Sequence, residues 1–460
     1  MRRITWKTCA AVAILVAPLV NCAGDKPEAS TEPSASRHAP PPPPPNPTAA
    51  LVRQLAAGRG VVAMPRRPYV RPALVELGRA LAFDKILSGN RDISCMTCHL
   101  PEYATGDARR LSIGQGARGL GPDRVHPQGI NIPRNAPSAF NLAAMQHLFL
   151  DGRVEKLPHG GISTPAGSQV TPRMQRVFEF GPASAIGMFP VGNRDEMRAY
   201  QGNELAAIDD ADNPAIWDAL MHRLGQIPEY RRMFERAYPG QRFRDMTFAH
   251  ASNAIGGFLV HDLTFDDTPW DRFLAGKDNA LTPKQLAGAQ TFMSIKCSLC
   301  HNGSTFSDEK FHNVAVAQFG PGKGNGPSLR DDFGRENITG DPTDRYRFRT
   351  SPLRNVELTA PYGHDGAITS LRDFIAHYSE SDKKLLAYDP MQLDPSLRAT
   401  LIPNSSDVIA QRDTIIIGVV LTDSIVNSLT DYMSALTDDR ARNLRELTPH
   451  HVPSGLRVDR

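Results

Sequence analysis

Apolar side chains recur every three or four residues over two stretches of this 460-residue chain, which is the spacing of helices that bury one face. The first stretch comprises Leu74, Val75, Leu77, Leu81 and Phe83. The second comprises Phe248, Ala251, Ile255, Phe258 and Leu259. No long stretch alternates apolar and polar positions as a large sheet requires, so the pattern predicts a mainly α fold with long loops.

A further helix is predicted from Thr282, since Pro283 takes the first helical position and Gln285 completes a capping box. The Gly-, Pro- and Asn-rich segments between the predicted helices are typical of loops. The number of residues is sufficient for two or three domains.

The N-terminus has the pattern of a targeting segment. Basic residues precede an apolar run at 9–20 that is too short to span a bilayer, which predicts a signal peptide over residues 1–22. The run Leu19-Val20-Asn21-Cys22 resembles a lipoprotein cleavage box, with Cys22 as the lipidated residue. An ordinary cleaved signal is the alternative. We expect a periplasmic, membrane-anchored lipoprotein.

Six consecutive prolines at 40–45 favour an extended polyproline II segment, and residues 23–62 are predicted to be a Pro-rich disordered tether. The formal net charge is only +3, so nothing in the composition favours a nucleic acid as partner.

Four of the six cysteines lie in two Cys-x-x-Cys-His pentads, at 95–99 and 297–301. Such a pentad offers two thiols for thioether attachment of a haem, followed by a histidine that binds its iron. Two covalently bound c-type haems are therefore predicted. Haem 1 is attached at Cys95 and Cys98 with His99 as ligand, and haem 2 at Cys297 and Cys300 with His301.

Each pentad follows a predicted helix, a weak repeat consistent with two cytochrome c-like domains. We expect an N-terminal haem domain over 63–265, a C-terminal haem domain over 266–445 and a tail over 446–460. The second of the two amphipathic stretches ends the first domain.

Several ordered motifs beyond the pentads resemble the bacterial di-haem cytochrome c peroxidases. They are PRNAPSAFN at 133–141, LDGR at 150–153 and NRDEM at 193–197 in the first half, and PLRNVELTAPYGHDGA at 352–367 in the second. The resemblance covers about residues 70–440 and implies the di-haem cytochrome c peroxidase fold. It also implies reaction with hydrogen peroxide.

The far side of haem 1 departs from the ordinary peroxidases of this family. Sixteen residues after the proximal ligand they carry a histidine in a Ser-Ile-Gly-His run, and Gln115 stands there in this chain. An amide is a poor iron ligand, so haem 1 is predicted to be open to peroxide. The alternative is that His126, in the following loop, binds the iron instead.

By the same resemblance Glu196 is the acid–base residue that moves a proton between the peroxide oxygens, and Pro190 also matches the family pattern. The family's glutamine ten residues before this Glu is replaced by Ile186.

The far side of haem 2 departs as well. Ordinary members carry a methionine ligand fourteen residues after the histidine that is His364 here, and Tyr378 stands at that position. A phenolate favours ferric and higher-valent iron, whereas a thioether raises the reduction potential. Tyr378 is therefore the predicted second ligand of haem 2, with His377 and then Met391 as rivals.

An open haem 1 and a tyrosine-ligated haem 2 are typical of the MauG-like branch, which includes MbnH-like proteins. This resemblance implies that peroxide produces a high-valent di-haem state, which oxidises Trp or Tyr side chains of a partner protein. The tryptophan that usually bridges the haems is Leu150 in this chain. A peroxide-scavenging peroxidase fed by a small redox protein is the alternative, and a non-enzymatic electron-transfer cytochrome is the second.

The family also binds a calcium ion between its domains, through an Asn side chain and backbone carbonyls. Asn135, Thr359 and Pro361 match those positions, and oxygen ligands suit this hard cation. The alternative is that Asn135 caps a turn.

Overall fold

Helices dominate the computed structural model, which describes residues 47–460. The predicted signal peptide, the predicted lipidation site Cys22 and the proline run lie outside the described residues. The helices are α1 Pro47–Gly58, α2 Pro72–Phe83, α3 Cys95–Cys98, α4 Pro172–Gln175, α5 Asn213–Gly225, α6 Pro228–Ala237, α7 Phe248–Asp262, α8 Pro269–Leu274, α9 Pro283–Ser294, α10 Cys297–Cys300, α11 Glu336–Thr339, α12 Leu371–His377, α13 Ser381–Leu386, α14 Ser405–Ala410 and α15 Asp423–Ser434. The predicted mainly α fold is confirmed.

Strands are few and short. β1 (His147–Leu148), β2 (Val154–Lys156) and β3 (Ile162–Ser163) form one antiparallel sheet, and β4 (Phe311–His312) pairs with β5 (Phe348–Arg349) in another. In the second sheet His312 lies opposite Phe348, which brings residues from both ends of a long loop region together.

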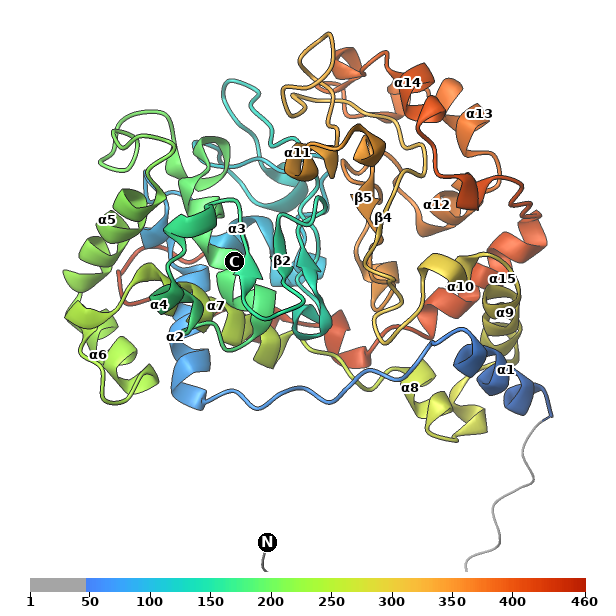
Figure 1. Cartoon of the computed structure of the whole chain (residues 1–460), viewed down its shortest axis with the longest axis horizontal. Coiled ribbons are helices and arrows are strands. Elements are labelled where there is room, and N and C mark those ends of the chain that lie inside the picture. The colour runs from blue at the N-terminus through green and yellow to red at the C-terminus, as the bar shows by residue number, and fades with distance from the viewer. Residues whose placement is uncertain (1–46) are drawn as a thin grey trace, which may run out of the picture. The chain divides into compact units, whose positions relative to one another are not determined.

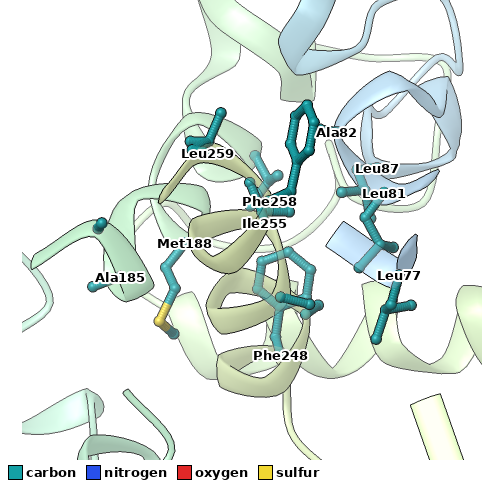
Figure 2. Close-up of a cluster of buried hydrophobic side chains, with 14 of the residues drawn as sticks. Leu77, Leu81, Ala82, Leu87, Ala185, Met188, Phe248, Ile255, Phe258 and Leu259 are labelled. Carbon is teal, nitrogen blue, oxygen red and sulfur yellow. The ribbon is translucent and has the colours of Figure 1, made fainter. Parts of the chain in front are cut away.

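The core of the N-terminal half is built around α7, whose residues from Phe248 to Val260 are all buried. Figure 2 shows Leu77 and Leu81 of α2 on one side of α7 and Met188 on another. Gly78 of α2 makes this packing possible, because a Cβ there would collide with the backbone of Ala254. Both amphipathic helices predicted from the apolar spacing are thus confirmed.

A second core lies in the C-terminal half, where α1, α8, α9 and α15 pack together (Figure 1). α9 begins as predicted: the Thr282 hydroxyl accepts the Gln285 N–H at 3.3 Å, and the Gln285 side chain accepts the Thr282 N–H at 2.9 Å. The apolar clusters of the two halves separate between Phe265 and Trp270. The domain boundary at 265/266 stays a prediction.

The predicted disordered tether is wrong for residues 47–62. Residues 47–58 form α1, and Ala49, Val52 and Ala56 on one face of it are fully buried against the C-terminal core. Val61 is also buried, and Val62 donates its N–H to Gly303 beside the second pentad at 3.4 Å. The burial of this apolar face offsets the entropy lost on ordering the segment.

The tail at 446–460 packs on the N-terminal half, with Val452 and Val458 buried there. Across residues 47–460, no helix combines the length and apolar character needed to cross a bilayer.

Candidate haem sites

The two pentads fold into the same short turn of helix. The first and last residues of α3 are Cys95 and Cys98, and those of α10 are Cys297 and Cys300. None of the four thiols is in a disulfide. One helical turn places both cysteines of a pair on the same side of the chain. Burial raises the pKa of Cys95 to about 11 and that of Cys297 to about 12. Uncharged sulfur is favoured in these surroundings, as in a thioether to a haem.

The histidine of each pentad is oriented by a backbone carbonyl. The ring Nδ1 of His99 donates to the carbonyl of Thr105 at 2.9 Å, and Nδ1 of His301 donates to that of Phe306 at 3.0 Å. Because Nδ1 carries the proton, Nε2 keeps its lone pair for a metal. Both histidines are therefore prepared in the same way to bind iron.

A large apolar cavity adjoins the second pentad. Its lining includes Cys297, Cys300, His301, Leu150, Phe374 and Met433. Arg349 also lines it, is buried, and donates to the carbonyls of Phe149 at 3.3 Å and Thr350 at 3.1 Å. Burial lowers the pKa of its guanidinium to about 10.

Among residues 47–460, no carboxylate lies within ion-pair distance of Arg349. A buried cation without an anion is costly, and a haem propionate is an anion of the right kind. The apolar lining, the two thiols and this arginine fit a haem in the cavity.

Tyr378 lines the same cavity as His301 and directly follows the last residue of α12. Burial raises the pKa of its phenol, so the free side chain is neutral, and a bound ferric ion would supply the charge that favours phenolate. The two rivals lie elsewhere. His377 donates Nε2–H to the carbonyl of Val314 at 2.8 Å, and Met391 is 61% exposed. Ligation by Tyr378 stays a prediction.

Gln115 and Glu196, the predicted far-side residues of the first site, lie together. The Gln115 N–H donates to the Glu196 carbonyl at 2.9 Å, and the Gln115 side chain accepts from Asn90 at 3.3 Å. Glu196 lies in η8 (Arg194–Arg198), one wide helical turn of a type often found at functional sites. Pro190 begins the short turn η7 (Pro190–Gly192) that precedes it.

Glu196 has the electrostatics of a proton-transfer group. Burial raises its pKa, and the positive charges of Arg153 and Lys323 offset part of that rise. Its backbone is fixed because the Asn193 side chain accepts the N–H groups of Asp195 at 2.9 Å and Glu196 at 3.1 Å. Its catalytic role stays a prediction.

His126, the alternative ligand for the first site, is buried and already hydrogen-bonded. Its Nδ1 accepts the N–H groups of Gln128 at 3.1 Å and Ile130 at 3.5 Å. The neutral ring therefore carries its proton on Nε2, which leaves no lone pair there for iron. This geometry favours an open first site.

The halves meet at a buried ion-pair network beside the second cavity. Arg134 donates two hydrogen bonds to Asp332, at 2.6 and 2.8 Å, and a third to Asp151 at 2.6 Å. Leu150, the residue before Asp151, lines the cavity, and its carbonyl accepts the backbone N–H of Arg349 at 2.8 Å.

Sequence reasoning assigned no role to three residues of the second cavity. They are Arg349, His364 and His312. His364 stacks on Phe348 with ring centroids 4.0 Å apart, and burial lowers its pKa to about 4. The recognised motif that contains His364 could have drawn attention to this residue. The burial of Arg349 without a carboxylate leaves no mark in the sequence.

His312 lies beside Cys300 and is held by two carboxylates. Nδ1 is 2.6 Å from an Asp413 oxygen and Nε2 is 3.1 Å from an Asp308 oxygen. Burial disfavours its charged form, but hydrogen bonds to Asp308, to the free thiol of Cys300 and to Asp413 outweigh that effect and raise the pKa of His312 to about 10. Its ring is therefore a charged neighbour of the second pentad at neutral pH.

Of the predicted calcium residues, Pro361 lines a surface hollow and Asn135 is hydrogen-bonded to two residues of that lining. Asn135 donates its side-chain N–H groups to the carbonyls of Arg109 at 2.6 Å and Arg110 at 3.2 Å, and both arginines line this hollow with Pro361. Thr359 donates its hydroxyl to Val356 at 3.1 Å. Turning the Asn135 amide over would join its oxygen to two carbonyl oxygens, a set that suits calcium. The calcium site stays a prediction.

Known proteins resemble this chain over most of its length. A family model described as di-haem cytochrome c peroxidase matches residues 72–279. Cytochrome c551 peroxidase of Pseudomonas aeruginosa is 31% identical over 65% of this chain and 70% of its own length. The methylamine utilization protein MauG of Methylorubrum extorquens is 25% identical over 70% of this chain and 72% of its own.

Among solved structures, a MauG-like protein associated with microbial copper homeostasis superposes with a TM-score of 0.58 and 25% identity. The alignment covers 84% of this chain and 97% of that one. The di-haem peroxidase BthA of Burkholderia thailandensis, at 21% identity and a TM-score of 0.54, shares the fold.

Proposed function

The chain belongs to the di-haem cytochrome c peroxidase family, and from this premise we propose that it uses hydrogen peroxide to oxidise aromatic side chains, Trp or Tyr, of a partner protein. The membership makes it a di-haem oxidoreductase with two c-type haems. The finer assignment, to the MauG-like branch and to a protein substrate in the periplasm, is the proposal.

Haems bound at the two pentads would supply the electrons that reduce peroxide. The chain's own contribution at the first site is proton transfer. Glu196, half-buried and with a raised pKa, would accept a proton from the near peroxide oxygen and return it to the far one. Gln115 would hydrogen-bond in the site without closing it, since an amide does not compete for the iron.

The observation that carries the proposal is Tyr378 in the cavity of His301. A phenolate opposite His301 would stabilise an oxidised haem 2 and make it a poor electron donor. An enzyme that scavenges peroxide needs the reverse, because each cycle begins with an electron stored at that haem. Tyr378 therefore supports a reaction in which oxidising equivalents are kept and then passed on.

The scavenging peroxidase remains the second candidate, and the 31% identity to cytochrome c551 peroxidase favours it. The two candidates differ in the electron donor that they require. A scavenger turns over rapidly with a small reduced redox protein, whereas the proposed enzyme reacts with peroxide from its fully ferric form.

The test uses the full-length holoprotein and its Tyr378→Met variant, which restores the thioether of the ordinary peroxidases. We expect the wild type to react with peroxide when ferric and to turn over slowly with a reduced small cytochrome c. The variant should gain turnover with that donor. Rapid donor-dependent turnover by the wild type would contradict the proposal.

The lipid anchor at Cys22 and the calcium ion remain predictions that the proposed reaction does not require. Mass spectrometry of the mature N-terminus would test the first, and metal analysis after dialysis would test the second.

A further inference from the structure

An exposed tyrosine lies at the end of the turn that carries Glu196. Tyr200 is 57% exposed, and its hydroxyl donates to the Asp195 carboxylate at 2.8 Å. The guanidinium of Arg194 lies 5.7 Å from the centre of its ring. A solvent-exposed phenol that is hydrogen-bonded to a carboxylate can transfer its proton to that carboxylate when it loses an electron.

The backbone is strained at Ala199, the residue that brings Tyr200 and Asp195 together. Ala199 has φ 70° and ψ 168°, a region that is essentially confined to glycine and costs about 1–3 kcal/mol for other residues. The residue at this bend precedes Tyr200 and turns the chain so that the phenol reaches back to Asp195. Strain of this kind persists only where the surrounding structure imposes it.

Two arginines impose it. Arg198 is fully buried and donates to the Leu205 carbonyl at 2.9 Å and to Asp210 at 2.8 Å. Arg194 donates to the Ala199 carbonyl at 3.2 Å and also pairs with Asp210 at 2.7 Å. The loop that presents Tyr200 is therefore held rigidly from both sides of the bend.

The same loop is in direct contact with the first haem site. A Cβ on Gly114 would collide with the Asp195 carbonyl, and Gln115 is hydrogen-bonded to Glu196. Tyr200 follows Glu196 by four positions, so their Cα atoms are at most about 14 Å apart. Single electrons cross protein interiors over such distances.

We propose that Tyr200, with Asp195 as its proton acceptor, is a surface site of one-electron oxidation through which the first haem site withdraws electrons from an aromatic side chain of a partner protein. This inference rests on the proposed function and adds the place where the oxidising equivalent leaves the protein.

The electrons and protons balance over one peroxide. Reduction of hydrogen peroxide to two waters takes up two electrons and two protons. In each of two steps Tyr200 gives one electron to the haem site and its phenolic proton to Asp195. The resulting phenoxyl radical then takes one electron from the partner's side chain and recovers the proton from Asp195. The partner loses two electrons and two protons in all.

The test uses full-length holoprotein without a partner, mixed with peroxide and frozen at successive times for electron paramagnetic resonance. We expect a radical whose hyperfine structure narrows when the tyrosines are ring-deuterated. Tyr200→Phe should remove it, whereas Tyr69→Phe, at a residue that is 81% exposed, should leave it unchanged. Asp195→Asn should slow its formation by about a hundredfold, since general-base assistance is worth at least that much.

A second readout does not depend on catching the radical. Exposed phenoxyl radicals on two copies couple through their rings, so peroxide should produce covalent dimers whose cross-linked peptides contain Tyr200. The Tyr200→Phe variant should form none.

Two outcomes would overturn the proposal while leaving the proposed function intact. One is a tyrosyl radical of equal yield in the Tyr200→Phe variant. The other is a wild type whose haem absorbance responds to peroxide but in which no protein radical or dimer forms. A wild type whose absorbance does not respond would instead contradict the proposed function itself.

Discussion

The two haem sites are alike where the haem is attached and unlike on the opposite side. In both, the histidine Nδ1 donates to a loop carbonyl, at 2.9 Å for His99 and 3.0 Å for His301. Gln115 and Glu196, which are hydrogen-bonded through their backbones, are the predicted far-side residues of the first site, whereas the apolar cavity of the second is lined by Tyr378. The attachment motif thus identifies the cofactor, and the proposed difference in chemistry rests on residues far from it in sequence.

The largest effect is expected from removing the feature that most distinguishes the second site. Tyr378→Phe deletes the proposed oxygen ligand, so haem 2 should lose its six-coordinate low-spin signal and the oxidised state formed with peroxide should no longer accumulate. Optical and paramagnetic resonance spectra of the ferric protein measure the first effect, and rapid mixing with peroxide measures the second.

Met391→Leu is the matched control, because Met391 is 61% exposed and should leave both signals unchanged. A Tyr378→Phe spectrum identical to that of the wild type would exclude this ligand, and His377→Gln would then test the remaining rival.

The first site is tested by Glu196→Gln, which keeps the shape of the side chain and removes its proton transfer. The rate of reaction with peroxide should fall by about 10²–10⁴-fold. Stopped-flow absorbance measures it, with Glu229→Gln, the same change at an exposed carboxyl, as the control. A variant that reacts at the wild-type rate would exclude Glu196 from the reaction.

The pH dependence follows from the raised pKa of Glu196. As a base the group must be ionised to accept a proton, and burial makes it hold its own proton at a higher pH than an ordinary carboxyl. As the pH is lowered, the wild-type rate should therefore begin to fall at a pH above the usual pKa of a carboxyl group. The Gln variant should not show this fall. An unchanged pH profile in the variant would assign the titration to another group.

The contact between the two halves predicts a smaller effect, on stability. Arg134→Met leaves Asp332 buried without its cation, while Asp151 keeps only its pair with Arg153, and this should lower the free energy of unfolding by about 3–5 kcal/mol. Denaturant unfolding of the holoprotein measures it. Arg242→Met removes an exposed pair with Asp245 and should change the same quantity by less than about 1 kcal/mol. Equal losses in the two variants would contradict the assignment.

The smallest effect concerns the attachment turns themselves, which differ in their third residue. Thr97 is buried and donates to Asp459 of the tail at 2.6 Å, whereas Leu299 at the same place in the second pentad is 42% exposed. Asp459 also pairs with Lys85 at 2.6 Å. Asp459→Asn should cost about 1.5–3 kcal/mol. Thermal melting followed at the haem band measures this, and Leu299→Thr should have almost no effect.

Local signals in the sequence were sufficient for α2, α7 and α9, because an apolar face or a complete capping box determines a helix without help from distant residues. They also identified both pentads. The helix α1 was missed although Ala49, Val52 and Ala56 have helical spacing. The preceding proline run dominated that interpretation, and the small side chains form a helix face only because the C-terminal core receives them.

The rest of the site depends on contacts between distant segments. Arg349 becomes significant because it is buried without a carboxylate in the second cavity, and Tyr200 because the strained Ala199 turns it onto Asp195. Nothing local to either residue in the sequence marks these arrangements. The packing of the tail on the first pentad is of the same kind.

The central claim is that the two haems are opposites on their far sides, and the resting spin states test it most directly. Paramagnetic resonance of the full-length ferric holoprotein at low temperature, with no peroxide or donor added, should show one high-spin and one low-spin haem in equal amounts. Two low-spin haems would mean that a protein ligand closes the first site, and the account would then be wrong.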